Sequence, residues 1–308
     1  MNKLIIATRN SKLALWQSEH IKSILEKTHG IEVELKGFKT KGDKILDTPL
    51  AKIGGKGLFT KEIEEAMLRG EAHLAVHSLK DFPIEFPDEL KLCAITKRED
   101  VRDSFLSDKY SSIDELPKGA IVGTTSLRRR MQLLLHRDDL VIKDLRGNIN
   151  TRIQKLKDGE FDAIILAQAG INRLELGDIV SYIKPIDTKL MIPAMGQASL
   201  AVESIDDERV LKLLEVLHDE EAYIETKIER DFITALDGGC QVPIGIHAKL
   251  DGENINISAI LGYPNGEKLL KDEITCSKDE FDTIGTKLAN EFIAKGAKEI
   301  LKEAERLF

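Results

Sequence analysis

The chain contains 308 residues, and 45 Lys and Arg against 53 Asp and Glu give it a formal net charge of −8. With 42% hydrophobic and 32% charged residues it has the composition of a well-packed globular protein, which excludes a disordered chain. The sequence has no apolar stretch long enough for a membrane helix, the apolar run near Met1 is too short to predict a signal peptide, and the acidic balance argues against non-specific nucleic-acid binding. We therefore expect a cytoplasmic protein of two or three domains, without a disulfide framework because three cysteines cannot all pair.

The first two thirds of the sequence alternate short apolar runs with segments of helical periodicity. In the first set, a helix is predicted over Leu13 to Leu25 and another after Thr60, which is a candidate N-cap. The predicted strands of this set are residues 4–7, 33–35 and 74–76. A second set follows the charged stretch at 97–100, with helices beginning near Leu127 and Ile149. Its predicted strands are residues 120–123, 140–142 and 163–167.

Strands that alternate with helices predict parallel sheets, in which ligands bind at the carboxyl ends of the strands. The last third differs, because helices predicted between 207 and 236 precede a run of strands. Those strands are residues 244–250, 255–261 and 268–275, and a helix from about Asp279 to the C-terminus follows them. This part of the chain is therefore predicted to be a separate α+β module.

Arginine is concentrated in one part of the sequence, since half of the arginines lie between Arg128 and Arg173. Guanidinium groups form bidentate pairs with carboxylates and phosphates. Three short polar segments with adjacent arginines, at 8–11, 123–126 and 145–148, each connect a predicted strand to a helix, where backbone N–H groups also bind anions. The pattern indicates a polyanion site, and the alternative interpretation is a solvated basic helix face.

Two further segments carry candidate chemistry. Asp81, at the end of the buried strand before it, could act as a general acid or base or stabilise a cation, or could simply form a turn. The connection at 52–59 contains Gly and Lys but lacks the nucleotide P-loop pattern, so ATP binding is rejected. It is interpreted either as a mobile lid over an anionic ligand or as an ordinary surface loop. His73 and His77 have no metal-ligand spacing with the cysteines, and no metal site is expected.

Cys240 lies in the segment Gly238-Gly239-Cys240-Gln241-Val242-Pro243. Two glycines favour a tight, exposed loop, so the thiol is a candidate nucleophile or attachment point rather than the small buried hydrophobe that a lone cysteine usually is. Cys93 and Cys276 lie in strand-like runs and are interpreted as structural.

Taken together, six segments resemble the hydroxymethylbilane synthase (porphobilinogen deaminase) family. They are residues 7–11, 54–59, 75–81, 123–129, 145–148 and 238–243, which follow the family's order over almost the whole chain. Enzymes of this family join four porphobilinogen molecules head to tail with loss of ammonia and release hydroxymethylbilane by hydrolysis, in tetrapyrrole (haem) biosynthesis. The resemblance implies a cytoplasmic, monomeric transferase whose partner is porphobilinogen, with no nucleic-acid or membrane partner.

The family's fold implies two α/β lobes of the type II periplasmic-binding-protein kind plus a C-terminal α+β domain. Lobe one is expected at 1–96 with 196–215, and the arginine-rich lobe two at 101–192. The α+β domain is expected at 218–308 and contains the Cys240 loop.

The resemblance also implies a dipyrromethane cofactor, made from two porphobilinogen units and attached through a thioether to Cys240. Asp81 matches the catalytic aspartate, which hydrogen-bonds pyrrole N–H groups and stabilises positive charge as ammonia leaves. The residues implied to bind the cofactor are Lys80, Asp81, Thr124, Ser126, Arg128, Arg129, Arg146 and Arg152. Those implied to bind the substrate are Arg9, Ser11, Arg152 and Arg173, with Lys52, Lys56 and Phe59 from the lid. The Phe59 ring could stack on a pyrrole. A cofactor extended by four rings carries about twelve carboxylates, which explains concentrated cations in an acidic protein.

One position departs from the family's pattern. After Gln197 the family commonly has Gly-Ala, whereas this chain has Ala198-Ser199. If position 198 requires a positive φ, alanine there costs on the order of 1 kcal/mol.

Two other functions are possible interpretations of the sequence. A non-catalytic, two-lobed anion-binding protein would have no need of the exposed thiol, and DNA binding through 128–130, which would be strongly salt-dependent, is disfavoured by the acidic charge and the few aromatic residues.

Overall fold

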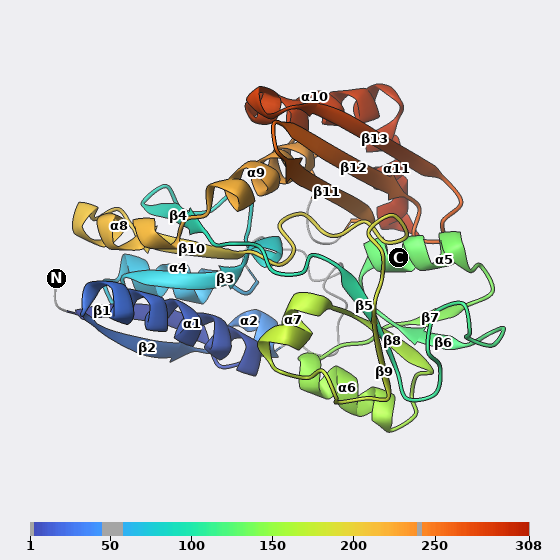
Figure 1. The fold of residues 1–308 in the computed structure, drawn as a ribbon, viewed down its shortest axis with the longest axis horizontal. Coiled ribbons are helices and arrows are strands. Elements are labelled where there is room, and N and C mark those ends of the chain that lie inside the picture. The colour runs from blue at the N-terminus through green and yellow to red at the C-terminus, as the bar shows by residue number, and fades with distance from the viewer. Residues whose placement is uncertain (1–2, 45–57, 239–241, 308) are drawn as a thin grey trace. The chain divides into compact units, whose positions relative to one another are not determined.

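The structure is a computed structural model that describes residues 3–44, 58–238 and 242–307. The chain divides into two compact units, which are considered separately. Unit 1 comprises residues 1–99 and 198–223, and unit 2 comprises residues 100–197 and 224–308. The chain therefore leaves unit 1 after residue 99, returns at residue 198 and leaves again within a helix (Figure 1).

Unit 1 is built on a five-stranded sheet with the strand order β2-β1-β3-β10-β4. Its strands are β1 (Lys3–Arg9), β2 (Glu32–Phe38), β3 (Leu74–Ser78), β4 (Leu90–Ile95) and β10 (Leu200–Ile205). Its helices and 3₁₀ turns are α1 (Lys12–His29), α2 (Lys41–Lys44), α4 (Lys61–Leu68), η1 (Leu79–Asp81), α8 (Glu208–Leu214) and η2 (Glu215–Leu217).

Both faces of this sheet are covered. On one face, Leu4 and Ile6 pack against Ile21 of α1 and Val210 of α8. On the other face, Ala7 packs against residues of α4. Alternate residues of β1 therefore serve opposite cores, which is why this strand is apolar without interruption from Leu4 to Ala7.

Unit 2 contains a second five-stranded sheet, with the strand order β7-β6-β8-β5-β9. Its strands are β5 (Asp103–Ser107), β6 (Ile121–Gly123), β7 (Val141–Lys143), β8 (Ala163–Ala167) and β9 (Tyr182–Pro185). Its helices are α5 (Leu127–His136), α6 (Ile149–Lys157) and α7 (Gln168–Arg173). Leu133 of α5 packs on one face of the sheet, and Ile153 of α6 and Ile171 of α7 pack on the other.

The two sheets share one topology and differ from the prediction in the same way. Each contains one antiparallel strand, β10 in unit 1 and β5 in unit 2, so the sheets are mixed rather than parallel. In both cases this is the first strand after the chain enters the unit. The chain enters each of these strands from the other unit and not from a preceding helix of the same sheet. Hydrophobic periodicity reports only local structure, so it could not predict the direction of these strands.

The remainder of unit 2 is the predicted α+β module. Helix α9 (Glu220–Ala235) precedes an antiparallel sheet with the order β11-β12-β13, and η3, α10 and α11 close the chain. The bounds are β11 (Ile244–Asp251), β12 (Asn254–Gly262), β13 (Leu269–Ser277), η3 (Lys278–Glu280), α10 (Phe281–Ala294) and α11 (Ala297–Arg306). Met131 of α5 packs against Ile260 of β12, which joins this sheet to the rest of unit 2. The single C-terminal helix that the sequence predicts is wrong, because Gly296 at φ +90° divides it into two.

The other predicted elements are confirmed to within a few residues, and β4 contains the strand-like run around Cys93, but α2, β5, α7, β9 and β10 were not predicted from the sequence. Within the described part of the chain, no helix is long and apolar enough to cross a membrane.

Candidate functional site

In unit 1, the polar segment after β1 forms the start of α1. Ser11 is the N-cap, and its hydroxyl oxygen accepts a hydrogen bond from the Ala14 backbone N–H at 3.3 Å. The first turn of α1 contains no acidic residue. The Ser11 O–H can still donate, so this helix end presents a hydroxyl and backbone N–H groups to an anion.

Arg9, the last residue of β1, lies over the aromatic ring of Phe59, with the guanidinium carbon 4.3 Å from the ring centroid. Both side chains are partly exposed. The structure therefore brings together two of the residues predicted to bind substrate. Lys52 and Lys56, which were predicted to accompany them, lie outside the described residues.

The segment after β3 carries Lys80 and Asp81 in the 3₁₀ turn η1. The Leu79 N–H donates to the Ser199 carbonyl at 3.0 Å, and the Phe82 N–H donates to the Leu79 carbonyl at 3.1 Å. Leu79 and Phe82 are fully buried, whereas Asp81 between them is exposed and Lys80 is half-buried. The turn thus has two apolar anchors, and it presents the Asp81 carboxylate outward.

A buried polar cluster lies behind this turn. His77 Nε2 lies 3.2 Å from Glu203 Oε2, and the imidazole also contacts the Phe82 ring at a centroid distance of 5.3 Å. The Oε1 atoms of Glu64 and Glu203 are buried and accept no hydrogen bond from the described residues. Burial raises the pKa of the Glu64 carboxyl and Glu203 adds to this effect, although Thr60 and His77 act in the opposite sense.

In unit 2, the segment between β6 and α5 repeats the arrangement that follows β1. Ser126 is the N-cap of α5 and accepts a hydrogen bond from the Arg129 N–H at 3.4 Å. Thr124 is buried, and its hydroxyl accepts a hydrogen bond from the Ser126 N–H at 3.2 Å. The first turn of α5 again contains no acid.

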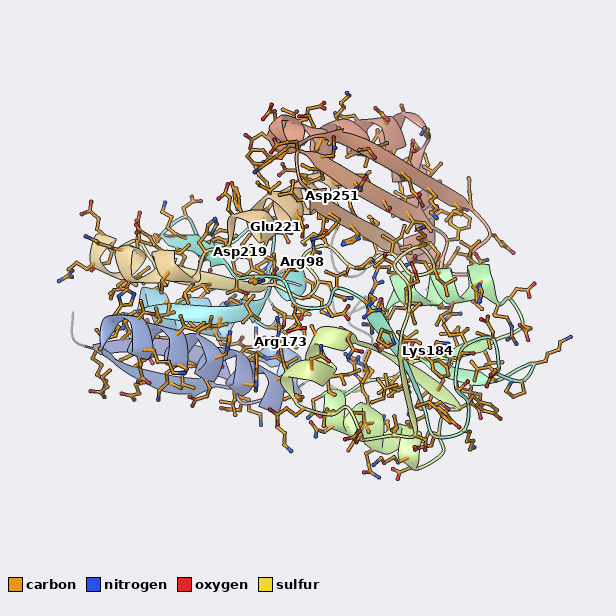
Figure 2. All side chains as sticks on the ribbon, viewed as in Figure 1. Arg98, Arg173, Lys184, Asp219, Glu221 and Asp251 are labelled. Carbon is orange, nitrogen blue, oxygen red and sulfur yellow. The ribbon has the colours of Figure 1, made fainter. Side chains whose placement is uncertain are left out.

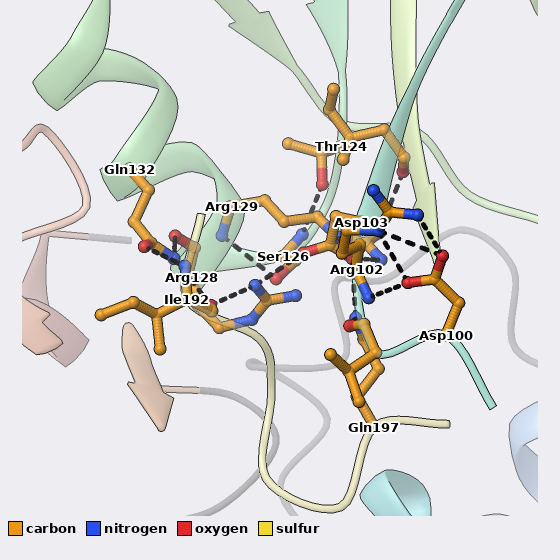
Figure 3. A network of polar contacts seen from close by, with 12 residues as sticks. Asp100, Arg102, Asp103, Thr124, Ser126, Arg128, Arg129, Gln132, Ile192 and Gln197 are labelled. Carbon is orange, nitrogen blue, oxygen red and sulfur yellow. Dashed lines mark hydrogen bonds and ion pairs between the residues drawn. The ribbon is translucent and has the colours of Figure 1, made fainter. Parts of the chain in front are cut away.

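Arg128 and Arg129 share one buried counter-ion, Asp103 at the start of β5 (Figure 3). Arg128 donates from Nη1 to Asp103 Oδ2 and to the Ile192 carbonyl, both at 2.7 Å. Arg129 donates from Nε and Nη2 to Asp103 Oδ1 and from Nη1 to the Ile165 carbonyl. Burial alone would raise the pKa of Asp103, but the two guanidinium groups outweigh it and hold the pKa well below its usual range. Arg128 makes these two bonds with Nη1 alone, whereas Arg129 uses all three guanidinium nitrogens.

The other predicted arginines of unit 2 lie in or next to α6 and α7. Arg146 precedes α6, whose N-cap Asn148 accepts a hydrogen bond from the Thr151 N–H at 2.9 Å. Arg152 of α6 donates from Nε to the Gly147 carbonyl at 2.8 Å. Gly147 has a φ of +113°, and a Cβ there would lie 2.8 Å from the Thr151 side chain, so this turn requires glycine. Arg173 is buried at the end of α7, where Figure 2 labels it.

Asp103, the centre of the arginine network, was not predicted from the sequence. Gln197 also reaches it, donating from Nε2 to Asp103 Oδ1 at 3.1 Å. The one available signal was indirect, since adjacent arginines that become buried need a counter-charge from elsewhere in the chain.

The three cysteines differ in their surroundings. Cys240 lies outside the described residues, between Gly238 and Val242. Cys93 and Cys276 lie on β4 and β13, as predicted. Burial raises the pKa of the Cys93 thiol to about 11 and also raises that of Cys276. Both are therefore poor thiolates. Within the described residues, no group of three or more His, Cys, Asp or Glu side chains could hold a metal ion.

These residues define a class of protein, α/β proteins whose helix N-termini are suited to binding anions. Helix α1 of unit 1, and helices α5 and α6 of unit 2, each begin after the carboxyl end of a strand with a capping side chain, without acid in the first turn and with an arginine nearby.

Comparison with known proteins narrows this class to one family. Residues 4–212 match the profile described as "Porphobilinogen deaminase, dipyromethane cofactor binding domain", and residues 223–294 match "Porphobilinogen deaminase, C-terminal domain". A protein named porphobilinogen deaminase from Campylobacter curvus is 60% identical, and the match covers 100% of the chain and 99% of that relative. One from Campylobacter jejuni is 61% identical, and the match covers 99% of both. One from Aliarcobacter butzleri is 59% identical, covering 100% of the chain and 99% of that relative.

The chain belongs to the porphobilinogen deaminase family, so the resemblance stated from the sequence is confirmed. The expected fold class, two α/β lobes plus a C-terminal α+β domain, is confirmed as well. Among solved structures, the methionine binding protein MetQ is a distant match, with 16% identity and a TM-score of 0.42 over 72% of this chain and 92% of that one. A TRAP periplasmic solute binding protein from Desulfovibrio salexigens matches with 14% identity and a TM-score of 0.42 over 71% and 73% of the two chains.

Proposed function

We propose that the chain is a deaminating transferase of tetrapyrrole (haem) biosynthesis. It joins four porphobilinogen molecules head to tail, loses one ammonia at each addition and releases hydroxymethylbilane by hydrolysis. The observation that carries this proposal is the end-to-end match to porphobilinogen deaminases at about 60% identity, across both family domains.

The cofactor-binding profile over residues 4–212 implies a dipyrromethane group, and we propose Cys240 as its covalent anchor. Two observations support this choice. The segment that contains Cys240 connects α9 to β11, after two glycines, whereas Cys93 and Cys276 lie on strands with raised thiol pKa values. When bound, the group supplies the pyrrole carbon to which the first porphobilinogen is added.

The residues of this chain fit such a group by the chemistry of their donors. Its side chains are carboxylates, and the residues offer guanidinium, ammonium and hydroxyl donors together with the N-termini of α5 and α6. The residues proposed to hold it are Lys80, Asp81, Thr124, Ser126, Arg128, Arg129, Arg146 and Arg152. Within this set, Arg128 is better placed than Arg129 to donate to a ligand, because Asp103 and the Ile165 carbonyl already engage all three nitrogens of Arg129.

Asp81 is the proposed catalytic residue. Its carboxylate would accept hydrogen bonds from pyrrole N–H groups and stabilise the positive charge that develops on the substrate ring as ammonia leaves. The exposed position of Asp81 on a turn with two buried anchors supports this role, because a fixed carboxylate needs no reorganisation when charge appears.

The acetate and propionate of porphobilinogen require cations and hydroxyl donors of their own. The residues proposed to bind the substrate are Arg9, Ser11, Arg152 and Arg173, together with Lys52, Lys56 and Phe59. Arg9 and Ser11 lie at the carboxyl end of β1 and the N-terminus of α1, which supports their assignment to one carboxylate.

The family membership also supports three proposals about the whole protein. Its three sheets would belong to three domains, at 1–96 with 196–215, at 101–192 and at 218–308.

The protein would act in the cytoplasm as a monomer, without nucleic-acid or membrane partners. Light scattering during size-exclusion chromatography tests the oligomeric state, and a dimer would contradict the proposal.

The intact mass of the denatured, purified protein tests the function directly. We expect an excess equal to two porphobilinogen units less two ammonias, and its loss in Cys240→Ser but not in the control Cys276→Ser. Incubation of an unmodified protein with porphobilinogen should produce the same increment and release ammonia. A protein that gains no mass and releases no ammonia would refute the proposal.

Replacement of Asp81 tests the catalytic assignment. Asp81→Ala should fold and carry the cofactor increment but lose at least about 100-fold in kcat, because the developing positive charge loses its counter-ion. Asp88→Ala, an exposed acid a few residues along the chain, is the matched control and should keep wild-type turnover. Substantial turnover by Asp81→Ala would remove Asp81 from the mechanism.

A further inference from the structure

The backbone of Ile192, in the connection between β9 and β10, contacts helix α5 within unit 2 (Figure 3). Its carbonyl oxygen accepts hydrogen bonds from Arg128 Nη1 at 2.7 Å and from Gln132 Nε2 at 3.1 Å. The Ile192 side chain is buried and packs with Met131 of α5 and Ile260 of β12. One backbone oxygen therefore accepts hydrogen bonds both from the Gln132 amide and from an arginine that is proposed to bind the cofactor.

Gln132 holds both backbone polar groups of Ile192. Its Oε1 accepts a hydrogen bond from the Ile192 N–H at 2.7 Å, and its Nε2 donates to the Ile192 carbonyl. The same Nε2 also donates to the Arg128 carbonyl, one helical turn earlier, at 3.4 Å. Gln132 is only 3% exposed, so water does not compete for these bonds. The bonds use both ends of the amide and fix the Ile192 carbonyl in place.

Strand β11 contacts the same part of the connection. The Ile246 N–H donates to the Pro193 carbonyl at 3.0 Å. A Cβ on Gly245 would lie 2.9 Å from the Ile192 carbonyl oxygen and 3.2 Å from Ile192 Cβ, which is too close for an unchanged backbone. Glycine at position 245 therefore lets β11 pack against Ile192, and a larger residue would displace the carbonyl or the strand.

The Ile192 carbonyl is one of two acceptors that fix the Arg128 guanidinium. The other is Asp103 Oδ2, which also lies 2.7 Å from Arg128 Nη1. Two bonds from one nitrogen fix the orientation of the whole guanidinium, because the group is planar and both hydrogens of that nitrogen lie in the plane. Nε and Nη2 of Arg128 make no hydrogen bond with the residues that the structure describes, and the same two bonds fix their direction.

We propose that Gln132 is a positioning residue for Arg128. By holding the Ile192 carbonyl, it keeps the guanidinium in the orientation that receives a carboxylate of the dipyrromethane cofactor. The identity of this ligand rests on the proposed function. Gln132 acts through Ile192 and Arg128 and not by a contact of its own with the cofactor, and Gly245 supports the same carbonyl from β11. A guanidinium that is already ordered loses less side-chain freedom when the cofactor binds, which favours its uptake.

The rate of cofactor uptake by protein purified without the cofactor tests this proposal. After porphobilinogen is added, intact mass spectrometry follows the increment expected for the cofactor. Gln132→Met, which keeps the length of the side chain and removes its hydrogen bonds, should slow uptake about 3- to 30-fold. Gly245→Ala should also slow uptake, because it displaces the same carbonyl. Once loaded, both variants should keep a KM for porphobilinogen within about 2-fold of wild type, because the substrate is proposed to bind other residues.

Two controls separate positioning from a loss of stability. Ser107 of β5 is buried in the five-stranded sheet of unit 2, and its hydroxyl donates to the Asp162 carbonyl at 2.6 Å. Ser107→Ala should therefore lower the melting temperature, as Gln132→Met does, but leave the uptake rate of the folded protein unchanged. Gly177→Ala is the control for Gly245→Ala and should change neither property, because its φ is ordinary and a Cβ there has no neighbour within 4 Å. Uptake that is slowed equally in Gln132→Met and Ser107→Ala would overturn the positioning role.

A spectroscopic measurement on the protein without cofactor separates this proposal from the proposed function. The guanidinium NMR resonances of Arg128, identified by their loss in Arg128→Lys, should be sharp in the wild type because two bonds hinder rotation of the Nη1 group. They should broaden in Gln132→Met and Gly245→Ala and stay sharp in Ser107→Ala. Unchanged resonances in both variants, or uptake at the wild-type rate in both, would overturn the proposal. If the wild-type protein gains no mass from porphobilinogen, the proposed function fails, and these resonances still decide whether Gln132 holds Arg128.

Discussion

At the residue scale, Ala198 occupies a backbone conformation that favours glycine. Its φ is +82° and it is buried at the point where the chain enters unit 1 for the second time. Position 198 therefore has the positive φ for which the family's usual glycine would be suited. Outside glycine, such a conformation costs about 1–2 kcal/mol, because Cβ approaches the carbonyl oxygen too closely.

Replacing this alanine with glycine should stabilise the protein. Ala198→Gly removes the strain but gives the unfolded chain more freedom, which leaves a net gain on the order of 1 kcal/mol. Ala194→Gly is the control, because Ala194 has no positive φ and should lose stability. Urea unfolding followed by circular dichroism measures both, and equal losses in the two variants would show that position 198 is not strained.

The Glu64 carboxyl gives a pH-dependent prediction. Because burial raises its pKa above the ordinary value of 4.5, Glu64 contributes stability below that pH, which is lost as the pH rises through the folded-state pKa. The charged groups that act on it are Glu203 and Glu65, which favour the neutral acid, and His77, which opposes them. The melting temperature of Glu64→Gln minus that of the wild type should therefore be larger at pH 8 than at pH 4.5.

The neighbouring residue on α4 supplies the control for this prediction. The Glu65 side chain is half exposed and pairs only at 3.9 Å with Arg69, so Glu65→Gln should follow the wild-type melting temperature across the pH range. Parallel curves for wild type and Glu64→Gln would show that Glu64 is ionised at no cost.

At the element scale, the strands recognised from the sequence have apolar residues in a continuous run, as in β1, or at alternate positions, as in β2. Strand β5 was missed because Asp103, Ser104 and Ser107 are polar yet fully buried. Their partners are distant: Arg128 and Arg129 for Asp103, Gln168 for Ser104, and the Asp162 carbonyl for Ser107. A local sequence pattern does not show hydrogen bonds made with distant residues. Hydrophobic periodicity therefore could not predict this interior strand.

The candidate site was predictable where it is built from local chemistry. A polar residue between a strand and a helix becomes an N-cap whatever the rest of the fold does, and Ser11, Ser126 and Asn148 are all N-caps. The burial of Arg128 and Arg129 was not predictable, because it depends on Asp103 from a strand that the chain enters through a crossing.

This dependence predicts a large effect for one substitution in β5. Asp103→Asn keeps the size of the side chain but leaves two buried guanidinium groups without their counter-ion, so it should cost about 3–5 kcal/mol. Asp100→Asn removes the partner of the partly exposed Arg102 and should cost about 0–1 kcal/mol. Urea unfolding measures both. Because the folded state lowers the pKa of Asp103, this carboxylate stabilises the protein above its ordinary pKa of 3.8. That stabilisation is lost as the pH falls through the folded-state pKa, so the free energies of unfolding of the two variants should converge in acid.

At the scale of the whole molecule, an acidic protein has to bind an acidic substrate. The net charge of −8 repels porphobilinogen at long range, and only local cations attract it. The KM for porphobilinogen should therefore rise several-fold between about 50 and 500 mM KCl, since the distance over which exposed charges are screened falls from about 14 Å to about 4 Å across this range. Circular dichroism at each salt concentration checks that the protein stays folded, and a KM independent of salt would show that burial shields these contacts.

Strand β10, which completes the sheet of unit 1, follows the excursion of the chain through unit 2, and this fixes when the sheet can form during synthesis on the ribosome. Strand β10 lies between β3 and β4 and pairs with both, so the first 99 residues of the nascent chain lack one interior strand of their sheet. At translation rates of about 5–20 residues per second, the stretch from residue 100 to 197 delays its arrival by roughly 5–20 s. During that time β3 presents an unpaired, apolar edge, which is the kind of surface that chaperones bind and that aggregates.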